Sequence, residues 1–419
     1  MSTLTVTTVA GGDTAGAAGE FFFCRSILYK SSSQFDSLPL VYVCLHNVAT
    51  AAVKYTVVDS NGTTVATASG TAGVATSITI AAAKTWSTAH PHLYDMHVEL
   101  EGGDAVVTYF GLREIALGAA QDHSGDAASG VTRPLLNGNF TFFAGFLDQS
   151  WWPDGQYTAP TDEALAFDIE AVAMFGLNMI RLHQKVNPER WYYHADRLGV
   201  AIFQDMIQKF VVLGGETSAT VPLFVSDLKK MIAQRGNHPA IIQWTTFNEG
   251  DCWSVFKTKP HDVAGMVDLT RNLSAPYGFR LVDTDSGGRA NNLHIGDIND
   301  IHSYPSPGNP VPSATQYAMV GEFGGIGAFV AGKEWLPHGC FSYLKVDTPR
   351  EEADAYIKMA ATLESRVSTI SASVYTQTTD VEKECDGYLN MDRSNKFSAA
   401  DTERIKAANQ AIIHASRSL

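Results

Sequence analysis

Two glutamates that follow apolar, strand-like runs are the residues of this sequence with the clearest capacity for chemistry. Glu249 follows the run 241–247 and Glu322 follows the run 317–320, with a glycine close behind each. A carboxyl group at the end of a buried strand reaches the rim of a parallel barrel, where the active sites of that fold lie. A lone glutamate there is more often a solvated residue, but two that face one cavity are the minimum needed to cleave a glycosidic bond.

The elements that must position this pair begin with a β-rich region over residues 36–117. Short runs of β-branched and aromatic residues alternate there with turn signals such as Ser60-Asn61-Gly62. Such runs at this spacing predict a β-sandwich. The expected strands cover 41–45, 53–58, 64–67, 76–80, 97–100 and 105–110. Residues 1–35, rich in glycine and alanine, are expected to form a loose lead-in whose structure stays open.

Residues 118–141 predict a polar connector followed by a hairpin, and residues 142–419 alternate strand-like and helix-like segments. Eight such units follow one another, the number that makes a (β/α)8 TIM barrel. Glu249 and Glu322 then end its fourth and seventh strands. An open doubly wound sheet would need a glycine-rich phosphate loop after its first strand, which this sequence lacks. The predicted fold class is therefore multidomain, a (β/α)8 TIM barrel preceded by a β-sandwich.

The bulk composition argues against several other classes of protein. The 419 residues carry a formal net charge of −14, which disfavours a nucleic-acid surface. No apolar run is long enough to span a bilayer, and the first residues do not resemble a secretory signal. We therefore expect a soluble protein, and its compartment stays unknown. Five cysteines without a CxxC pair predict mostly free thiols, and neither a zinc site nor a disulfide framework.

The residues near the two glutamates indicate which one would donate a proton and which one would stay ionised. Phe247 and Trp253 lie close to Glu249 in the sequence, and burial against them would raise its pKa and keep its proton for a leaving group. Glu322 has to stay ionised instead. Arg181, at the end of the second barrel strand, is the expected charge partner for it.

Several segments resemble glycoside hydrolase family 2, the family of β-galactosidases, β-glucuronidases and β-mannosidases. At the expected strand ends of the barrel, six segments resemble family motifs and keep the family's order: 147–163, 178–183, 247–250, 300–305, 321–325 and 375–382. Upstream, Trp86 with 91–94 and 109–113 resembles the immunoglobulin-like domain of the family. The family usually has a jelly-roll domain before that one, and we expect a member without it because only the lead-in precedes the sandwich.

The resemblance implies a role for ten residues, with Glu249 as acid/base and Glu322 as nucleophile. The other eight would bind substrate or orient the nucleophile, and they are Asp148, Trp152, Arg181, His183, Asn248, His302, Tyr304 and Tyr375. The arginine and Tyr304 would keep the nucleophile ionised, while the asparagine, the aspartate and the histidines would bind sugar hydroxyls. The tryptophan or the last tyrosine would pack against the sugar ring. A structural role for the tryptophan or the histidines stays open. No metal or organic cofactor is required by this chemistry.

The sequence therefore predicts a retaining exo-β-glycosidase, β-galactosidase-like, that hydrolyses terminal β-linked sugars by double displacement. The Asn-x-Lys pattern with which glucuronidases recognise a sugar carboxylate is missing, since Asn395 and Lys396 are adjacent. The alternative is a divergent or truncated family member that acts as a weakly active or inactive carbohydrate-binding protein. The expected partner is a carbohydrate substrate, with neither nucleic acid nor membrane, and a homo-oligomer stays open.

Overall fold

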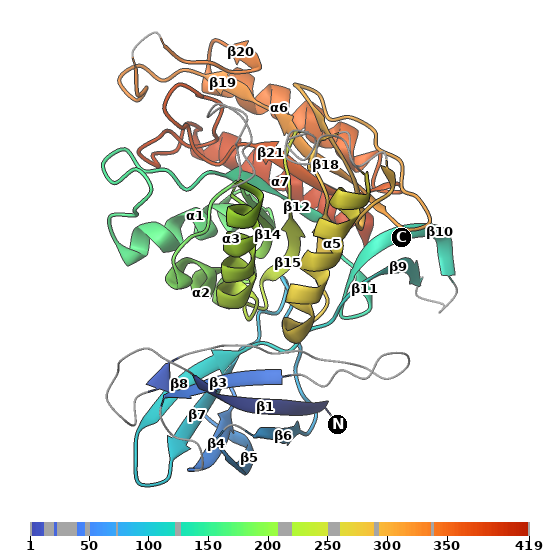
Figure 1. Cartoon of the computed structure of the whole chain (residues 1–419). Coiled ribbons are helices and arrows are strands. Elements are labelled where there is room, and N and C mark those ends of the chain that lie inside the picture. Colours follow the sequence, from blue (N-terminus) through green and yellow to red (C-terminus); the bar gives the residue numbers. More distant parts are fainter. Residues whose placement is uncertain are drawn as a thin grey trace.

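The structure, a computed structural model, describes residues 2–11, 21–22, 40–46, 51–72, 74–121, 127–207, 220–249, 260–288, 293–336 and 339–417. A β-sandwich formed by the first part of the chain lies against one end of a barrel of strands and helices (Figure 1). This architecture is the predicted multidomain fold.

Eight parallel strands form the barrel, and all but one of their neighbouring pairs are hydrogen-bonded in ladders. They are β12 (Phe143–Asp148), β13 (Met179–Leu182), β14 (Ala201–Asp205), β15 (Ile241–Thr245), β16 (Leu281–Asp283), β17 (Ile298–Ser303), β18 (Tyr317–Gly324) and β21 (Ile370–Thr376). The last strand returns beside the first, and β16 contacts β17 to complete the ring. Most strand residues are buried, because side chains fill the barrel and helices cover it.

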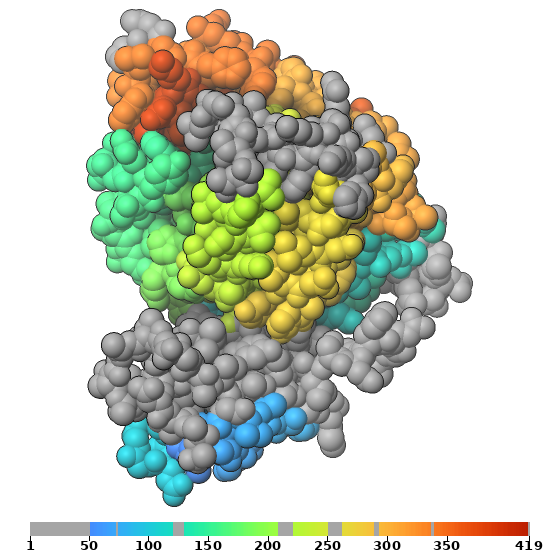
Figure 2. All heavy atoms as spheres, viewed as in Figure 1, coloured from blue at the N-terminus to red at the C-terminus, as the bar shows by residue number. Residues whose placement is uncertain are grey.

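Helices alternate with these strands and cover the outside of the barrel. They are α1 (Asp162–Met174), α2 (Glu189–Leu198), α3 (Thr220–Arg235), α5 (Pro260–Ser274) with the short η2 (Ala275–Tyr277), α6 (Pro349–Glu364) and α7 (Ala399–Ser416). The Thr161 hydroxyl accepts the Ala164 N–H at the start of α1, and Gly199 ends α2 with φ +76°. In Figure 2, α3 and α5 lie side by side on the face in view.

The sandwich consists of two four-stranded sheets, in the orders β2-β3-β1-β6 and β5-β4-β7-β8. Their strands are β1 (Ser2–Gly11), β2 (Phe21–Phe22), β3 (Leu40–His46), β4 (Ala52–Val58), β5 (Thr64–Thr71), β6 (Ala75–Ile80), β7 (Tyr94–Leu100) and β8 (Ala105–Phe110). Alternate residues such as Val53, Tyr55 and Val57 are buried in a separate core. This alternation is the period-2 signal of a half-buried strand.

Buried side chains join the sandwich to the end of the barrel where its strands begin. Trp86 donates its indole N–H to the Asp196 carbonyl at 2.7 Å, and the Tyr109 hydroxyl donates to the Asp196 carboxylate at 2.8 Å. Arg113 donates to the carbonyls of Pro239 and Ile241 at 2.8 and 3.0 Å. The opposite end of the barrel, where the strands finish, is therefore left to the candidate site.

The expected connector is itself a small antiparallel sheet that holds the two parts together. It contains β9 (Ile115–Gln121), β10 (Ala127–Leu136) and β11 (Asn139–Phe140). Arg133 on β10 donates to the carbonyls of Val367 and Ser368, which precede the last barrel strand, at 3.1 and 2.7 Å.

Residues 2–11, whose structure the sequence left open, form β1, which pairs with both β3 and β6. The pair Asn187-Pro188 predicts Asn187 as the cap of the helix that follows, and this prediction is wrong. Pro188 takes the cap position of α2, and the Asn187 side-chain amide donates to the Ser150 hydroxyl at 2.8 Å. In each case a partner far away in the sequence decides the local structure.

The helices that the structure describes include none that is both long enough and apolar enough to cross a membrane.

Candidate active site

The two glutamates lie at the same end of the barrel. Glu249 follows β15, and Glu322 lies within β18. One ligand atom from each of Glu249, Glu322 and His302 lies within 4.8 Å of the other two. Carboxyl groups of retaining glycosidases are about 5–5.5 Å apart, whereas those of inverting enzymes are about 6.5–9.5 Å apart. The close spacing suits one carboxylate that attacks and one carboxyl group that transfers a proton.

Glu322 is buried, and donors reach both of its carboxylate oxygens. Arg181 donates to Oε1 at 2.9 Å, and the Tyr304 hydroxyl donates to Oε2 at 2.6 Å. Burial by itself raises the pKa of Glu322, but His302 and Arg181 outweigh it, so the pKa lies below its ordinary value. Glu322 is therefore a carboxylate at neutral pH, the state that a nucleophile needs.

Arg181 is fully buried and links four strands of the barrel. Its guanidinium donates to both oxygens of Asp205, at 3.1 and 2.8 Å, and to the amide oxygen of Asn248 at 2.8 Å. The planar fork of arginine suits such simultaneous contacts. These bonds fix the guanidinium against Glu322 and orient Asn248 beside Glu249.

The main chain turns Glu249 out of its strand. Its φ of +53° is left-handed, which costs a residue with a Cβ about 1 kcal/mol. Backbone bonds hold this conformation, because Glu249 N–H donates to the Ser286 carbonyl at 2.8 Å and Ser286 N–H donates to the Phe247 carbonyl at 2.9 Å. The Glu249 side chain is 46% exposed. Phe247 instead packs on Phe224 in the interior, so it does not bury Glu249 as expected, and Trp253 lies outside the described residues.

His302 lies between the two glutamates. Its Nδ1 is 3.3 Å from the nearest oxygen of each, and its Nε2 is 2.9 Å from the Ser286 hydroxyl. Burial alone would lower the pKa of His302, but the charge of Glu322 and the hydrogen bond that the ring donates to Glu249 raise it overall. In this structure the ring therefore links the two carboxylates, whereas a contact with a sugar hydroxyl was expected.

The spacing of Glu249, His302 and Glu322 would also admit a metal ion. However, the Arg181 guanidinium and the Tyr304 hydroxyl already donate to both oxygens of Glu322. A fixed positive charge at 2.9 Å from a ligand oxygen repels a second cation there. We therefore interpret the cluster as a carboxylate pair and not as a metal centre.

Comparisons with known proteins find similarity to glycoside hydrolases. Residues 45–113 match the model of glycosyl hydrolases family 2. The chain is 24% identical over 179 residues to a β-galactosidase of Lactococcus lactis, and 29% identical over 202 residues to a putative β-glucuronidase of Formosa agariphila. These similarities support the resemblance to glycoside hydrolase family 2. These matches cover 40% and 45% of this chain, but only 16% and 23% of the two relatives.

Solved structures of family enzymes share the fold. A Bifidobacterium dentium β-glucuronidase, in complex with coumarin-3-O-glucuronide, superposes with a TM-score of 0.64 at 18% identity, over 85% of this chain and 61% of that one. A β-glucuronidase of Dictyoglomus thermophilum superposes with a TM-score of 0.66 at 15% identity, over 85% and 64%. At these identities the similarity establishes the fold alone.

The two aromatic residues that the family resemblance proposed for packing against the sugar ring lie in the interior. Trp152 is 2% exposed, and the cations of Lys185 and Arg393 lie 4.9 and 4.5 Å from its ring. Tyr375 is 1% exposed and packs against Tyr356 and other rings. Neither ring offers an open face to a sugar, because neighbouring side chains cover both.

The polar residues from the resemblance lie at different depths. Asp148 is buried, accepts the Ser150 N–H at 2.7 Å, and has its pKa raised to about 6 by burial and by Asp168. His183 is nearer the surface, with Nδ1 3.1 Å from Asp205. His183 therefore lies at the rim around Glu322, whereas Asp148 is enclosed in the interior.

Sequence reasoning missed an aromatic ring at the open end of the barrel. Tyr343, just before β20 (Leu344–Val346), stacks on Tyr304 with ring centroids 3.6 Å apart, and it is 42% exposed. A side chain at Gly325 would lie 2.3 Å from this ring, so the glycine permits the stack. No local pattern marks Tyr343, because its loop returns to the site only in three dimensions.

Cys340 and Cys385 form a disulfide, so the prediction of free thiols is wrong for this pair. They are 45 residues apart in the sequence, and only the fold brings them together. The bond joins the loop after β19 (Ile326–Ala328) to the loop after β21, both at the end that carries the glutamates.

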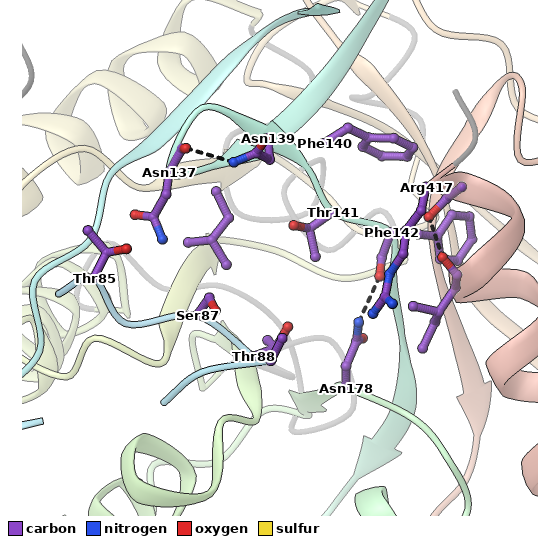
Figure 3. A pocket seen from close by; sticks show the side chains of 14 residues that line it. Thr85, Ser87, Thr88, Asn137, Asn139, Phe140, Thr141, Phe142, Asn178 and Arg417 are labelled. Carbon is purple, nitrogen blue, oxygen red and sulfur yellow. Dashed lines mark hydrogen bonds between the residues drawn. The ribbon is translucent and has the colours of Figure 1, made fainter. Parts of the chain in front are cut away.

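Two cavities lie at different ends of the barrel. One of about 590 Å³ adjoins the candidate site and is lined by rim residues that include Gln149, Tyr157 and His183. Another of about 360 Å³ lies between the sandwich and the start of the barrel (Figure 3). In it, Asn139 and Asn178 already donate to backbone carbonyls at 3.0 and 2.9 Å. Of these two cavities, the first adjoins the candidate site, because His183 lines it.

Proposed function

We propose that this protein is a retaining exo-β-glycosidase that hydrolyses terminal β-linked sugars. The observation that carries the proposal is the close pair of Glu249 and Glu322 at the strand ends of a family 2 barrel. The two glutamates differ in their surroundings, since Glu322 is buried and held ionised while Glu249 is half exposed. This difference supports Glu322 as the nucleophile and Glu249 as the acid/base. The β-galactosidase-like assignment is supported by the sequence resemblance and the Lactococcus lactis relative.

The proposed reaction has two steps. Glu322 attacks the anomeric carbon, and Glu249 gives its proton to the departing glycosidic oxygen, which leaves a covalent glycosyl–enzyme. Glu249 then takes a proton from water as the water attacks the same carbon, and the sugar leaves with its configuration retained. Arg181 and Tyr304 hold the nucleophile in place, and Asn248 and His183 are assigned to sugar hydroxyls.

The experiment is hydrolysis of 4-nitrophenyl β-glycosides of galactose, glucose, mannose and glucuronic acid by the full chain. Glu322→Gln should abolish turnover, while Glu364→Gln, the same change on an exposed helix residue, should not. Glu249→Ala should slow substrates with poor leaving groups most, with partial rescue by azide. Turnover that survives Glu322→Gln would refute the proposal. No turnover of any glycoside would instead favour a carbohydrate-binding protein.

A further inference from the structure

Two exposed aromatic rings extend outward from the tyrosine that holds the nucleophile. Tyr304 donates its hydroxyl to Glu322 at 2.6 Å, and its ring stacks on Tyr343 with centroids 3.6 Å apart. Tyr343 in turn contacts the Phe341 ring, with centroids 5.1 Å apart and ring planes inclined by 70°. Tyr343 and Phe341 are 42% and 52% exposed. These two residues form an aromatic platform that continues from the nucleophile to the surface.

The platform arises because side chains alternate along an extended segment. Over residues 341–346, exposed and partly buried residues alternate. Ser342, between the two rings, lies against Gly327, where an added Cβ would be 2.7 Å from the Ser342 Cβ. The two rings therefore lie on the opposite, outer side of the segment. The segment leads into β20, at the end of the barrel opposite the sandwich (Figure 1).

Backbone hydrogen bonds fix this segment on both sides of the rings. Phe341 donates its N–H to the Lys383 carbonyl at 2.6 Å, and its own carbonyl accepts the Cys385 N–H at 2.8 Å. The same cysteine forms the disulfide with the residue before Phe341. Leu344 donates its N–H to the carbonyl of Gly325 at 3.0 Å, and this glycine lies three residues after the nucleophile. The rings are thus held in place before a ligand binds, which lowers the entropy lost on binding.

The position of the platform indicates what it would contact. Isolated apolar side chains are common on protein surfaces, whereas rings that touch one another and continue into a candidate site indicate a ligand surface. Neither ring lines the 590 Å³ cavity, so the platform is a separate surface. An exo-glycosidase holds the terminal sugar at its catalytic pair, and everything beyond the cleaved bond is the leaving group. A ligand part on the platform would therefore belong to the leaving group.

We propose that Phe341 and Tyr343 form a binding subsite for the second sugar of an oligosaccharide, the one that departs as the leaving group. This inference rests on the proposed function and adds the substrate class. The C–H faces of a sugar are apolar and pack on aromatic rings. Because the two rings are inclined by 70°, a pyranose, which has C–H groups on both faces and at its edges, can contact both rings. A flat aromatic leaving group can stack on only one of them.

The test compares Phe341→Ala with Phe279→Ala, the same change at a ring that is 44% exposed and precedes β16 at the opposite end of the barrel. The substrates are two pairs that share a terminal sugar, lactose with methyl β-galactoside and cellobiose with methyl β-glucoside. Phe341→Ala should lower the ratio of kcat/KM for the disaccharide to kcat/KM for the methyl glycoside by about 3- to 10-fold, the size of one aromatic contact. The methyl glycoside rate should not change, and the control should leave the ratio unchanged.

A second readout does not need turnover. Calorimetry in the Glu322→Gln background compares the binding of each disaccharide with that of its methyl glycoside, with and without Phe341→Ala. The preference for the disaccharide should fall by the same factor as the kinetic ratio. Hydrolysis of 4-nitrophenyl β-galactoside by Phe341→Ala measures the effect on a flat aromatic leaving group.

The outcomes separate this inference from the proposed activity. Turnover with a disaccharide preference that Phe341→Ala leaves unchanged would overturn the subsite and leave the glycosidase standing. A loss confined to 4-nitrophenyl β-galactoside would assign the rings to an aromatic leaving group and overturn the sugar assignment. A preference for binding the disaccharide that depends on Phe341, without turnover by the wild type, would support the subsite and refute the hydrolytic function. Neither binding nor turnover of any of these sugars would overturn both.

Discussion

Removing one hydroxyl group, in Tyr304→Phe, tests how the site keeps its nucleophile ionised. The Tyr304 hydroxyl donates to Glu322 at 2.6 Å and also contacts the Thr376 hydroxyl at 2.7 Å. Burial and the nearby Glu322 charge raise the pKa of Tyr304, so it remains a donor over the working pH range. The substitution therefore removes one hydrogen bond to a charged acceptor while the ring stays in its stack.

A hydrogen bond to a charged group contributes about 1.5–3 kcal/mol, which corresponds to about 10- to 150-fold in rate. Because this bond stabilises the ionised form, its loss raises the pKa of Glu322. The acid limb of the kcat/KM profile should then move to higher pH. The loss of rate should be largest on the acid side and should shrink as pH rises, since the remaining His302 and Arg181 still favour the carboxylate.

The assay is the pH dependence of kcat/KM on an aryl β-glycoside, with Tyr343→Phe as the matched control. That variant removes a hydroxyl from the ring stacked on Tyr304 and leaves the bond to Glu322 intact. An equal loss at every pH, or the same displacement of the acid limb in the control, would refute the reasoning. The loss would then reflect a disturbed aromatic stack and not the charge state of Glu322.

Three further predictions concern stability. Arg113→Met should lower the unfolding temperature in calorimetry, because it leaves two carbonyls at the sandwich–barrel contact without their buried donor; an unchanged temperature would contradict this. Burial raises the pKa of Glu352 to about 8 from 4.5, so the folded state holds a proton that the unfolded state loses, and stability should fall as pH rises through this window. Chemical denaturation of Glu352→Gln should show a smaller fall, and an identical one would rule Glu352 out. Reduction of Cys340–Cys385, which are 45 residues apart, should cost about 4 kcal/mol by loop entropy, and a denaturation midpoint insensitive to reductant would contradict that estimate.

The sequence was sufficient for the order of the elements and for the strands that carry the two glutamates. Strand and helix periodicity is local, so β15 and β18 were predicted close to their observed positions. At helix ends where the cap is local, residue type and structure agree, since Thr161 caps α1 and Gly199 ends α2. The cap at Asn187 failed because a distant hydroxyl, that of Ser150, takes its amide.

Side-chain direction and the approach of distant loops depended on tertiary structure. Trp152 and Tyr375 occupy motif positions, yet packing from other elements encloses their rings. Tyr343 has no motif that reveals it, and its stack on Tyr304 places it at the site only in three dimensions. The sequence by itself determined which strands end in carboxylates, since that depends on neighbours along the chain. The tertiary structure decided which side chains surround them, since that depends on contacts between residues far apart in the sequence.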